Sequence, residues 1–112
     1  MAMFPVDPSL TGEVFAEGQL PNTKTTLYTC PAGVTAYVLF LRLYNSGAGG
    51  NTCRVYFKRG TSRVMGRAVL ATLETAEVID KDAPLTLEAG DLIEGDATNA
   101  TEVDYVITGA TG

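Results

Sequence analysis

The chain contains no histidine, and it lacks the sequence patterns of a nucleophile elbow, a phosphate-binding loop or a zinc cluster. Histidine is the side chain that enzymes use most often for proton transfer near neutral pH. Without it, the serine and threonine hydroxyls have no base that would activate them as nucleophiles. We therefore predict that the protein is not an enzyme and has no catalytic residues, no metal site and no cofactor.

Long apolar runs are also missing. No run approaches the roughly 18 apolar residues that a membrane-spanning segment needs, so we expect no membrane partner. Residues 1–12 have neither the basic start nor the apolar centre of a signal peptide, so we expect no secretory signal. The pattern is typical of a chain that folds in a reducing cytoplasm.

Cysteine is scarce. Cys30 and Cys53 are too few for a disulfide scaffold and are wrongly placed for zinc. We interpret both as small, buried, apolar side chains within strands. A disulfide between them is the alternative.

What the chain does contain is enough apolar sequence for one domain. A chain of 112 residues, 46% of them hydrophobic, can enclose one core but is short for two. Residues 1–12 are expected to form an extended N-terminal arm, because two prolines interrupt them and no strand period is visible. The arm's apolar side chains must pack on their own domain or on a neighbour. These side chains are Phe4, Val6 and Leu10.

The rest of the chain, 13–112, consists of short runs of β-type residues separated by Gly, Pro and Asn. The predicted strands are 13–17, 25–30, 35–45, 53–58, 85–87, 92–94 and 103–107. The weaker runs 68–73 and 77–79 could be strands or a short helix, and we favour strands. Residues 45–51 and 59–63 are expected to be loops, and 88–91 a turn. This spacing predicts an all-β fold, an antiparallel β-sandwich of jelly-roll type.

The longest run, 35–45, is apolar on both of its faces. At a period of two, one face carries Tyr37, Leu39, Leu41 and Leu43, and the other carries Val38, Phe40, Arg42 and Tyr44. A strand of this kind is buried on two sides. We expect one face in the core and the second, Val38 to Tyr44, either under the arm or in an oligomer interface.

Charge is divided unevenly along the chain, whose net charge is −5. Residues 42–67 hold six cations and no acid, whereas residues 68–112 hold ten acids and one lysine. The cations expected to contact a partner are Arg54, Lys58, Arg59, Arg63 and Arg67. Such a division favours contacts between charged surfaces of different molecules. The alternative is that folding brings the two halves together and they neutralise each other.

Two further patterns bear on binding chemistry. Glu88, Asp91, Glu94 and Asp96 could hold a hard cation, but their spacing matches no EF-hand loop, and a solvated acidic edge is preferred. The basic residues could suggest nucleic acid, but the overall negative charge argues against it. An acidic protein surface is the expected partner instead.

Three segments resemble small structural proteins of tailed bacteriophages. They are 26–38 (TLYTCPAGVTAYV), 43–46 (LYNS) and 87–93 (LEAGDLI). In those proteins an LY-x-x-PAG strand and turn, an x-N-x-x-G loop and a late L-x-x-GD-x-I turn recur within one β-sandwich. The overall organisation, over roughly residues 25–109, is most similar to capsid decoration proteins, also called cement or staple proteins.

The resemblance implies a structural role on the outer surface of a virion. The partners it implies are the major capsid protein and further copies of the chain, a homodimer being preferred over a trimer. The protein would be made in the bacterial host cytoplasm and would clamp neighbouring capsid subunits together. A carbohydrate-binding or host-attachment module of a phage tail or fibre, using exposed tyrosines, is the alternative.

Overall fold

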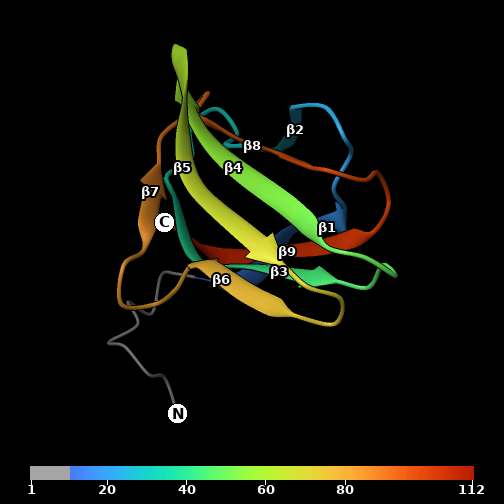
Figure 1. Cartoon of the computed structure of the whole chain (residues 1–112). Helices are drawn as coiled ribbons and strands as arrows, with labels where there is room; N and C mark the ends of the chain where they lie inside the picture. The colour runs from blue at the N-terminus through green and yellow to red at the C-terminus, as the bar shows by residue number, and fades with distance from the viewer. Residues whose placement is uncertain (1–10) are drawn as a thin grey trace.

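Nine β-strands make up most of residues 11–112, the part of the chain that the computed structural model describes (Figure 1). They are β1 (Thr11–Gln19), β2 (Thr25–Thr29), β3 (Ala36–Asn45), β4 (Asn51–Arg59), β5 (Thr61–Leu70), β6 (Thr75–Ile79), β7 (Leu85–Leu87), β8 (Leu92–Ala97) and β9 (Val103–Thr111). Within these residues there is no helix long and apolar enough to cross a membrane.

The strands pair in a nested order that defines a jelly roll. β1 pairs with β9, β2 with β8, β3 with β6, and β4 with β5, and every pair is antiparallel. The pairs are divided between two sheets, with strand orders β1-β9-β3-β6 and β2-β8-β4-β5 (Figure 1). We call them the β9 sheet and the β8 sheet; the short β7 adds to the former through β3. The predicted antiparallel sandwich of jelly-roll type is confirmed.

The core lies between the two sheets because alternate residues of each strand point inward. In the β9 sheet, Ile107 and Leu41 are opposite each other in register and are both fully buried. Cys53 and Val55 of β4 are buried from the other sheet. The large side chains that fill the centre are Leu20, Leu41, Leu43, Leu87, Ile93 and Ile107.

Most of the predicted strands agree with the structure to within a few residues, but the basic loop predicted at 59–63 is wrong. Gly60 alone separates β4 from β5, and its φ of +74° suits the tight reversal that joins them. Arg63 therefore lies within a ten-residue strand rather than in a loop. The helix alternative for 77–79 is also wrong, because these residues belong to β6.

A β-bulge in β3 overturns the predicted division of its two faces. The register with β9 shifts between Val38 and Phe40, which places Leu39 in the bulge. Inward residues are therefore Ala36 and Val38 before the bulge, and Leu41 after it. Val38 is fully buried in the core, so it does not share an outer face with Phe40, as a strict period of two predicts.

Two buried asparagines hold the loop that joins β3 to β4. Asn45 and Asn51 are 0% and 2% exposed, in a position where an unpaired amide would be costly. Asn45 Nδ2 donates to the carbonyl oxygens of Gly49 and Leu70, at 2.8 and 3.1 Å. Its Oδ1 accepts from Gly47 N and from Asn51 Nδ2, at 3.0 and 3.2 Å. The loop predicted from its glycines is thus tied to the sandwich by side chains.

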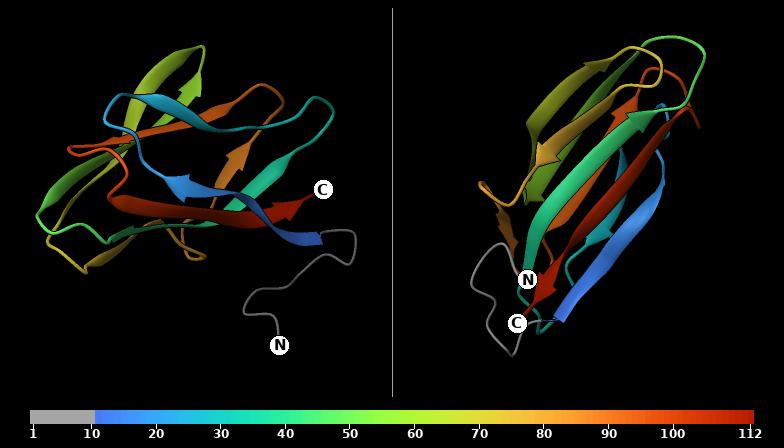
Figure 2. Two further views of the ribbon diagram at one scale, coloured as in Figure 1. Left: turned by 90° about the vertical axis from the view of Figure 1, so that its right-hand side faces the viewer. Right: turned by 90° about the horizontal axis from the view of Figure 1, so that it is seen from below.

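The chain ends of the sandwich lie side by side, because Thr11 at the start of β1 pairs with Thr111 at the end of β9 (Figure 2). β1 includes residues 11 and 12, which the sequence assigned to the arm. The predicted arm anchors Phe4, Val6 and Leu10 lie outside the described residues.

The close approach of Gly109 in β9 to the backbone of Tyr37 in β3 provides a test of the register between these two strands. A Cβ at Gly109 would overlap the carbonyl oxygen of Tyr37 and lie 2.8 Å from Phe15 Cε2. We expect Gly109→Ala to lower the free energy of unfolding by about 3 kcal/mol, measured by urea denaturation. The matched control is Gly49→Ala, where a Cβ meets nothing within 4 Å. Equal stability of the two variants would contradict the register of β3 against β9.

Candidate interaction surfaces

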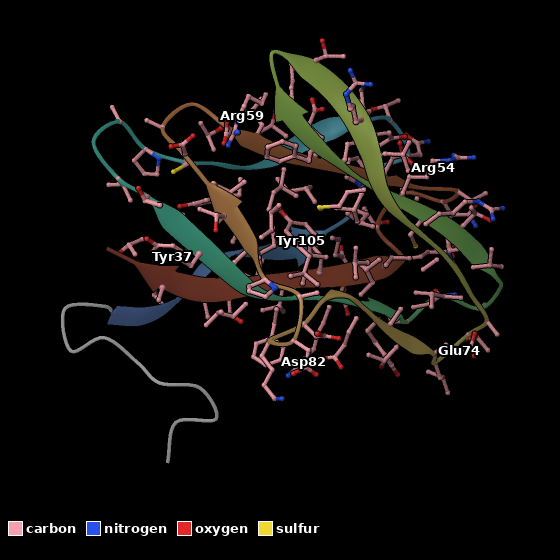
Figure 3. All side chains as sticks on the ribbon, turned by 90° about the vertical axis from the view of Figure 1, so that its left-hand side faces the viewer. Tyr37, Arg54, Arg59, Glu74, Asp82 and Tyr105 are labelled. Carbon is pink, nitrogen blue, oxygen red and sulfur yellow. The ribbon has the colours of Figure 1, made fainter. Side chains whose placement is uncertain are left out.

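Four cations project from the β4–β5 hairpin without an ion-pair partner among the described residues: Arg54, Lys58, Arg63 and Arg67. Arg54 and Arg67 are directly opposite each other in register, and both are exposed. Like charges at opposite positions of two strands repel each other and concentrate a positive potential. We call this group of four the cationic hairpin. Figure 3 shows Arg54 on the outside of the sandwich.

Carboxylates of β8 border the cationic hairpin on the same sheet. Asp96 is opposite Arg54 in register and accepts a hydrogen bond of 2.8 Å from Tyr56 Oη. Glu94 accepts a hydrogen bond of 2.7 Å from Ser62 Oγ and is 8% exposed. These acids offset part of the positive potential at the centre of the β8 sheet. The uncompensated charge lies toward β5, the edge strand.

Arg59, predicted to contact a partner, is engaged within its own chain. Its Nε donates to both carboxylate oxygens of Asp91, at 3.0 and 3.1 Å, and its Nη2 lies 3.6 Å from Glu88 Oε2. Asp91 is 4% exposed, and its Oδ2 also accepts a 2.8 Å bond from Glu88 N. The hydrogen bonds from Arg59 hold the pKa of Asp91 below its ordinary value, against the opposing effect of burial. This cluster fixes the β7–β8 turn to the end of β4.

The charge division of the sequence therefore has two outcomes in the structure. Arg59 pairs with Asp91, and Arg42 pairs with Glu77 at 3.2 Å, so part of the division is neutralised within one chain. The cationic hairpin is not neutralised in this way. Of the four acids considered as a cation site, Glu88 and Asp91 contact Arg59, whereas Glu94 and Asp96 accept hydrogen bonds from Ser62 and Tyr56. No group of three or more potential metal ligands occurs within residues 11–112.

A second surface lies on the outside of the β9 sheet. The strands β1, β9 and β3 lie side by side in this sheet (Figure 2, right). Their outward residues form three rows across the strands. The rows are Val14–Thr108–Phe40, then Glu17–Val106–Arg42, then Gln19–Asp104–Tyr44. We call these nine residues the β9 face. Phe40, Arg42, Val106 and Thr108 line a shallow hollow of about 280 Å³ within it.

Apolar side chains of the β9 face are open to solvent. Val14 is 58% exposed and Val106 is 40% exposed, while Phe40 is half-buried. The guanidinium of Arg42 lies 5.0 Å from the centroid of the Phe40 ring. Exposed apolar side chains that adjoin one another in this way are typical of contact surfaces.

Sequence reasoning identified part of this face and missed the rest. Phe40, Arg42 and Tyr44 were predicted to be an interface, and the structure places all three on the β9 face. Val14, Val106 and Thr108 were missed, because they come from β1 and β9. The alternation of 103–107 puts Val106 outside, but only the strand order shows that it adjoins Arg42.

The tyrosines do not form an exposed platform within residues 11–112. Tyr28 stacks on Phe15 with ring centroids 4.9 Å apart, and Tyr105 packs between the sheets (Figure 3). Tyr56 is covered by Lys24, whose Nζ lies 5.1 Å from the ring centroid. Among the five, Tyr44 is the most open, at 36% exposure.

Comparison with known proteins gives no family assignment, since neither a family model nor a curated protein matches the chain. A solved structure of disulfide-linked pili from Bacillus endospore appendages matches with a TM-score of 0.50 and 15% identity, over 99% of this chain and 94% of that chain. A pentameric capsid protein from metagenomic phage sequences matches with a TM-score of 0.42 and 18% identity, over 84% and 60%. A structure of infectious bursal disease virus, Gt strain, matches with a TM-score of 0.33 and 11% identity, over 99% of this chain and 36% of that chain. At 15% identity, the likeness to the pilus structure concerns the fold alone.

The cysteines set this chain apart from a disulfide-linked assembly. Cys30 and Cys53 are both free, and they are 1% and 0% exposed. Cys30 Sγ lies 3.3 Å from the carbonyl oxygen of Val34. Burial raises the pKa of the Cys53 thiol to about 11, and the charge of Asp96 adds to this effect. Neither thiol is placed to bond to another subunit.

The first prediction from this geometry concerns the buried carboxylate of Asp91. A carboxyl whose pKa is lowered by folding stabilises the fold above its unfolded pKa, and this contribution is lost as pH falls through the folded pKa. Asp91→Asn should therefore unfold about 1–2 kcal/mol more easily than the wild type at pH 7, with a difference that shrinks below about pH 4. Urea denaturation between pH 7 and pH 2 measures this. Asp82→Asn, at an exposed site, is the control, and a pH-independent difference for Asp91→Asn would contradict the ion pair.

The second prediction concerns thiol reactivity. Both cysteines should react with a thiol reagent at least about 100-fold more slowly in the native protein than in urea, because reagent needs an exposed thiolate. Reducing agent should leave the oligomeric state unchanged. A rapidly labelled native cysteine, or oligomers that reductant disperses, would contradict the buried placement.

Proposed function

We propose that this chain is a non-catalytic structural protein of a virion, which binds the outer surface of a phage capsid and clamps neighbouring major capsid subunits. The observation that carries the proposal is the cationic hairpin, whose four cations have no ion-pair partner in the described part of an otherwise acidic sandwich. The resemblance of segments 26–38, 43–46 and 87–93 to small structural proteins of tailed phages, with an overall organisation most similar to capsid decoration proteins, supports the same role. The chain is made in the host cytoplasm and joins the shell as a folded unit.

The cationic hairpin suits an acidic protein surface better than nucleic acid. Its cations lie on two strands bordered by Asp96 and Glu94, and the net charge of the chain is −5. A nucleic acid would meet Asp96 as well as the cations, whereas a protein can match both signs at short range. Arg54 and Arg67 are the central contacts. They lie opposite each other, and neither guanidinium group has an ion-pair partner among the described residues, so both can bind a carboxylate of the partner.

Attachment to a shell does not require a strong individual contact. A capsid presents the same acidic patch many times, so each copy that also touches a neighbour is held at a high effective concentration. The cationic hairpin and the β9 face lie on different sheets, so one copy can engage the shell through one and another protein through the other. Rigid strands fix the distance between the two contacts.

The test is cosedimentation of the purified protein with empty capsid shells that lack it. We expect saturable binding in fixed proportion to capsid subunits, weakened by salt because exposed charges are screened. Arg67→Glu should weaken binding about tenfold at low salt, because the introduced carboxylate would also pair with Arg54. Lys81→Glu makes the same change in net charge outside the hairpin and should bind as the wild type does. Arg67→Lys keeps the charge and should retain most of the affinity.

Absence of binding to shells would overturn the proposal. Binding that Arg67→Glu and Lys81→Glu weaken equally would assign attachment to net charge rather than to the hairpin, and would overturn the residue assignment. Binding to host glycans in place of shells would favour the attachment module of a tail or fibre.

A further inference from the structure

The β9 face carries a pattern that is complementary to itself. In each of its three rows, the residue of β1 and the residue of β3 lie on opposite sides of β9, at equal steps from it. The outer pairs are Val14 with Phe40, Glu17 with Arg42, and Gln19 with Tyr44. Each pair thus joins two apolar groups, two opposite charges or two polar groups.

We propose that the β9 face binds a second copy of this chain, in a dimer whose two-fold axis runs along β9 between the facing sheets. A rotation about this axis lays β1 of one copy over β3 of the other. Glu17 of each copy then faces Arg42 of the other, and Val14 faces Phe40, while the two Val106 side chains meet near the axis. Because the interface is isologous, every contact away from the axis occurs twice.

The charge pattern selects this axis over the other face-to-face arrangement. A two-fold axis running across the strands at the Val106 row would place Glu17 against Glu17 and Arg42 against Arg42. Like charges placed opposite each other at an interface are unfavourable, whereas opposite charges fix orientation. Aligned packing of two sheets at about −30° is also the common geometry of sandwiches.

The area of the β9 face determines how strongly the two copies are expected to bind. Three strands about 4.8 Å apart and about nine residues long give a projected area of roughly 14 by 30 Å. Stable complexes bury about 800 Å² of accessible surface per partner, which is more than this face offers. We therefore expect a dimer in exchange with monomer at micromolar concentration.

One position on the axis opposes association. Asp104 lies on β9, so the dimer brings the two Asp104 carboxylates near each other. Gln19 Nε2 donates to Asp104 Oδ1 at 3.2 Å within each copy, which relieves the repulsion only in part. Removal of this charge should strengthen the dimer, an effect that a loss of folding cannot imitate.

The experiment is sedimentation velocity on the full-length chain, without shells, between about 1 and 500 µM. All charge variants carry Glu77→Gln, because Glu77 pairs with Arg42 within the chain and would repel a glutamate at position 42. Glu17→Arg and Arg42→Glu should each weaken dimerisation at least about tenfold, since each reverses two symmetric contacts. The double variant Glu17→Arg/Arg42→Glu should restore it to within about threefold.

Two further variants test the axis itself. Asp104→Asn should tighten the dimer about threefold. Val106→Asp should abolish it, whereas the control Val69→Asp, at a valine of the β8 sheet that is 64% exposed, should not.

A chain that stays monomeric at all concentrations would overturn the inference. So would a dimer that Val69→Asp disrupts, that Asp104→Asn weakens, or that the double variant fails to restore. The inferred dimer does not rest on the proposed function. If the chain dimerises but does not bind shells, the dimer stands and the proposed function is overturned.

Discussion

The alternation of side chains across β3 and β9 is the constraint on which the other features depend. These two strands form the centre of the β9 sheet, and every residue of either strand belongs to the core or to the outer surface. The bulge at Leu39 resets the alternation, so that Val38 and Leu41 both reach the core. Without it, the residues after the bulge would exchange places, and Arg42 would enter the core while Leu41 faced solvent.

The same alternation produces the two contact surfaces. On β3 it leaves Phe40, Arg42 and Tyr44 outside, beside the outward residues of β9 and β1. On β4 and β5 it places Arg54 opposite Arg67 on the outside of the other sheet. A jelly roll thus separates a face with exposed apolar side chains from a cationic one, because its nested pairing divides neighbouring segments of the chain between two sheets.

The ion pairs within the chain hold turns and strands in position. Asp91 is nearly buried and binds Arg59 with both oxygens, which fixes a turn to the end of β4. Arg42 and Glu77 join β3 to β6 at the surface, where an ion pair contributes little to stability. Arg54, Lys58, Arg63 and Arg67 of the cationic hairpin have no ion-pair partner among the described residues, so they are available to another molecule.

Strand periods and turn residues were sufficient to predict the fold class, most strands and the 88–91 turn. They failed where a single residue changes the geometry. Leu39 looks like any strand residue, so the bulge and the burial of Val38 were not foreseen. Gly60 makes a reversal so tight that the residues after it, including Arg63, are strand rather than loop. Only three of the nine residues of the β9 face were identified, because Val14 and Val106 adjoin Phe40 and Arg42 only through strand order, which local patterns do not contain. The internal role of Arg59 could not be predicted, since Asp91 is 32 residues away.

The most direct test of the account is a cryo-electron microscopy reconstruction of empty shells incubated with the purified protein. The account predicts added density on the outer surface, across junctions between capsid subunits, with the β4–β5 hairpin turned toward the shell. Shells without added density, or density in which the hairpin faces solvent, would contradict it.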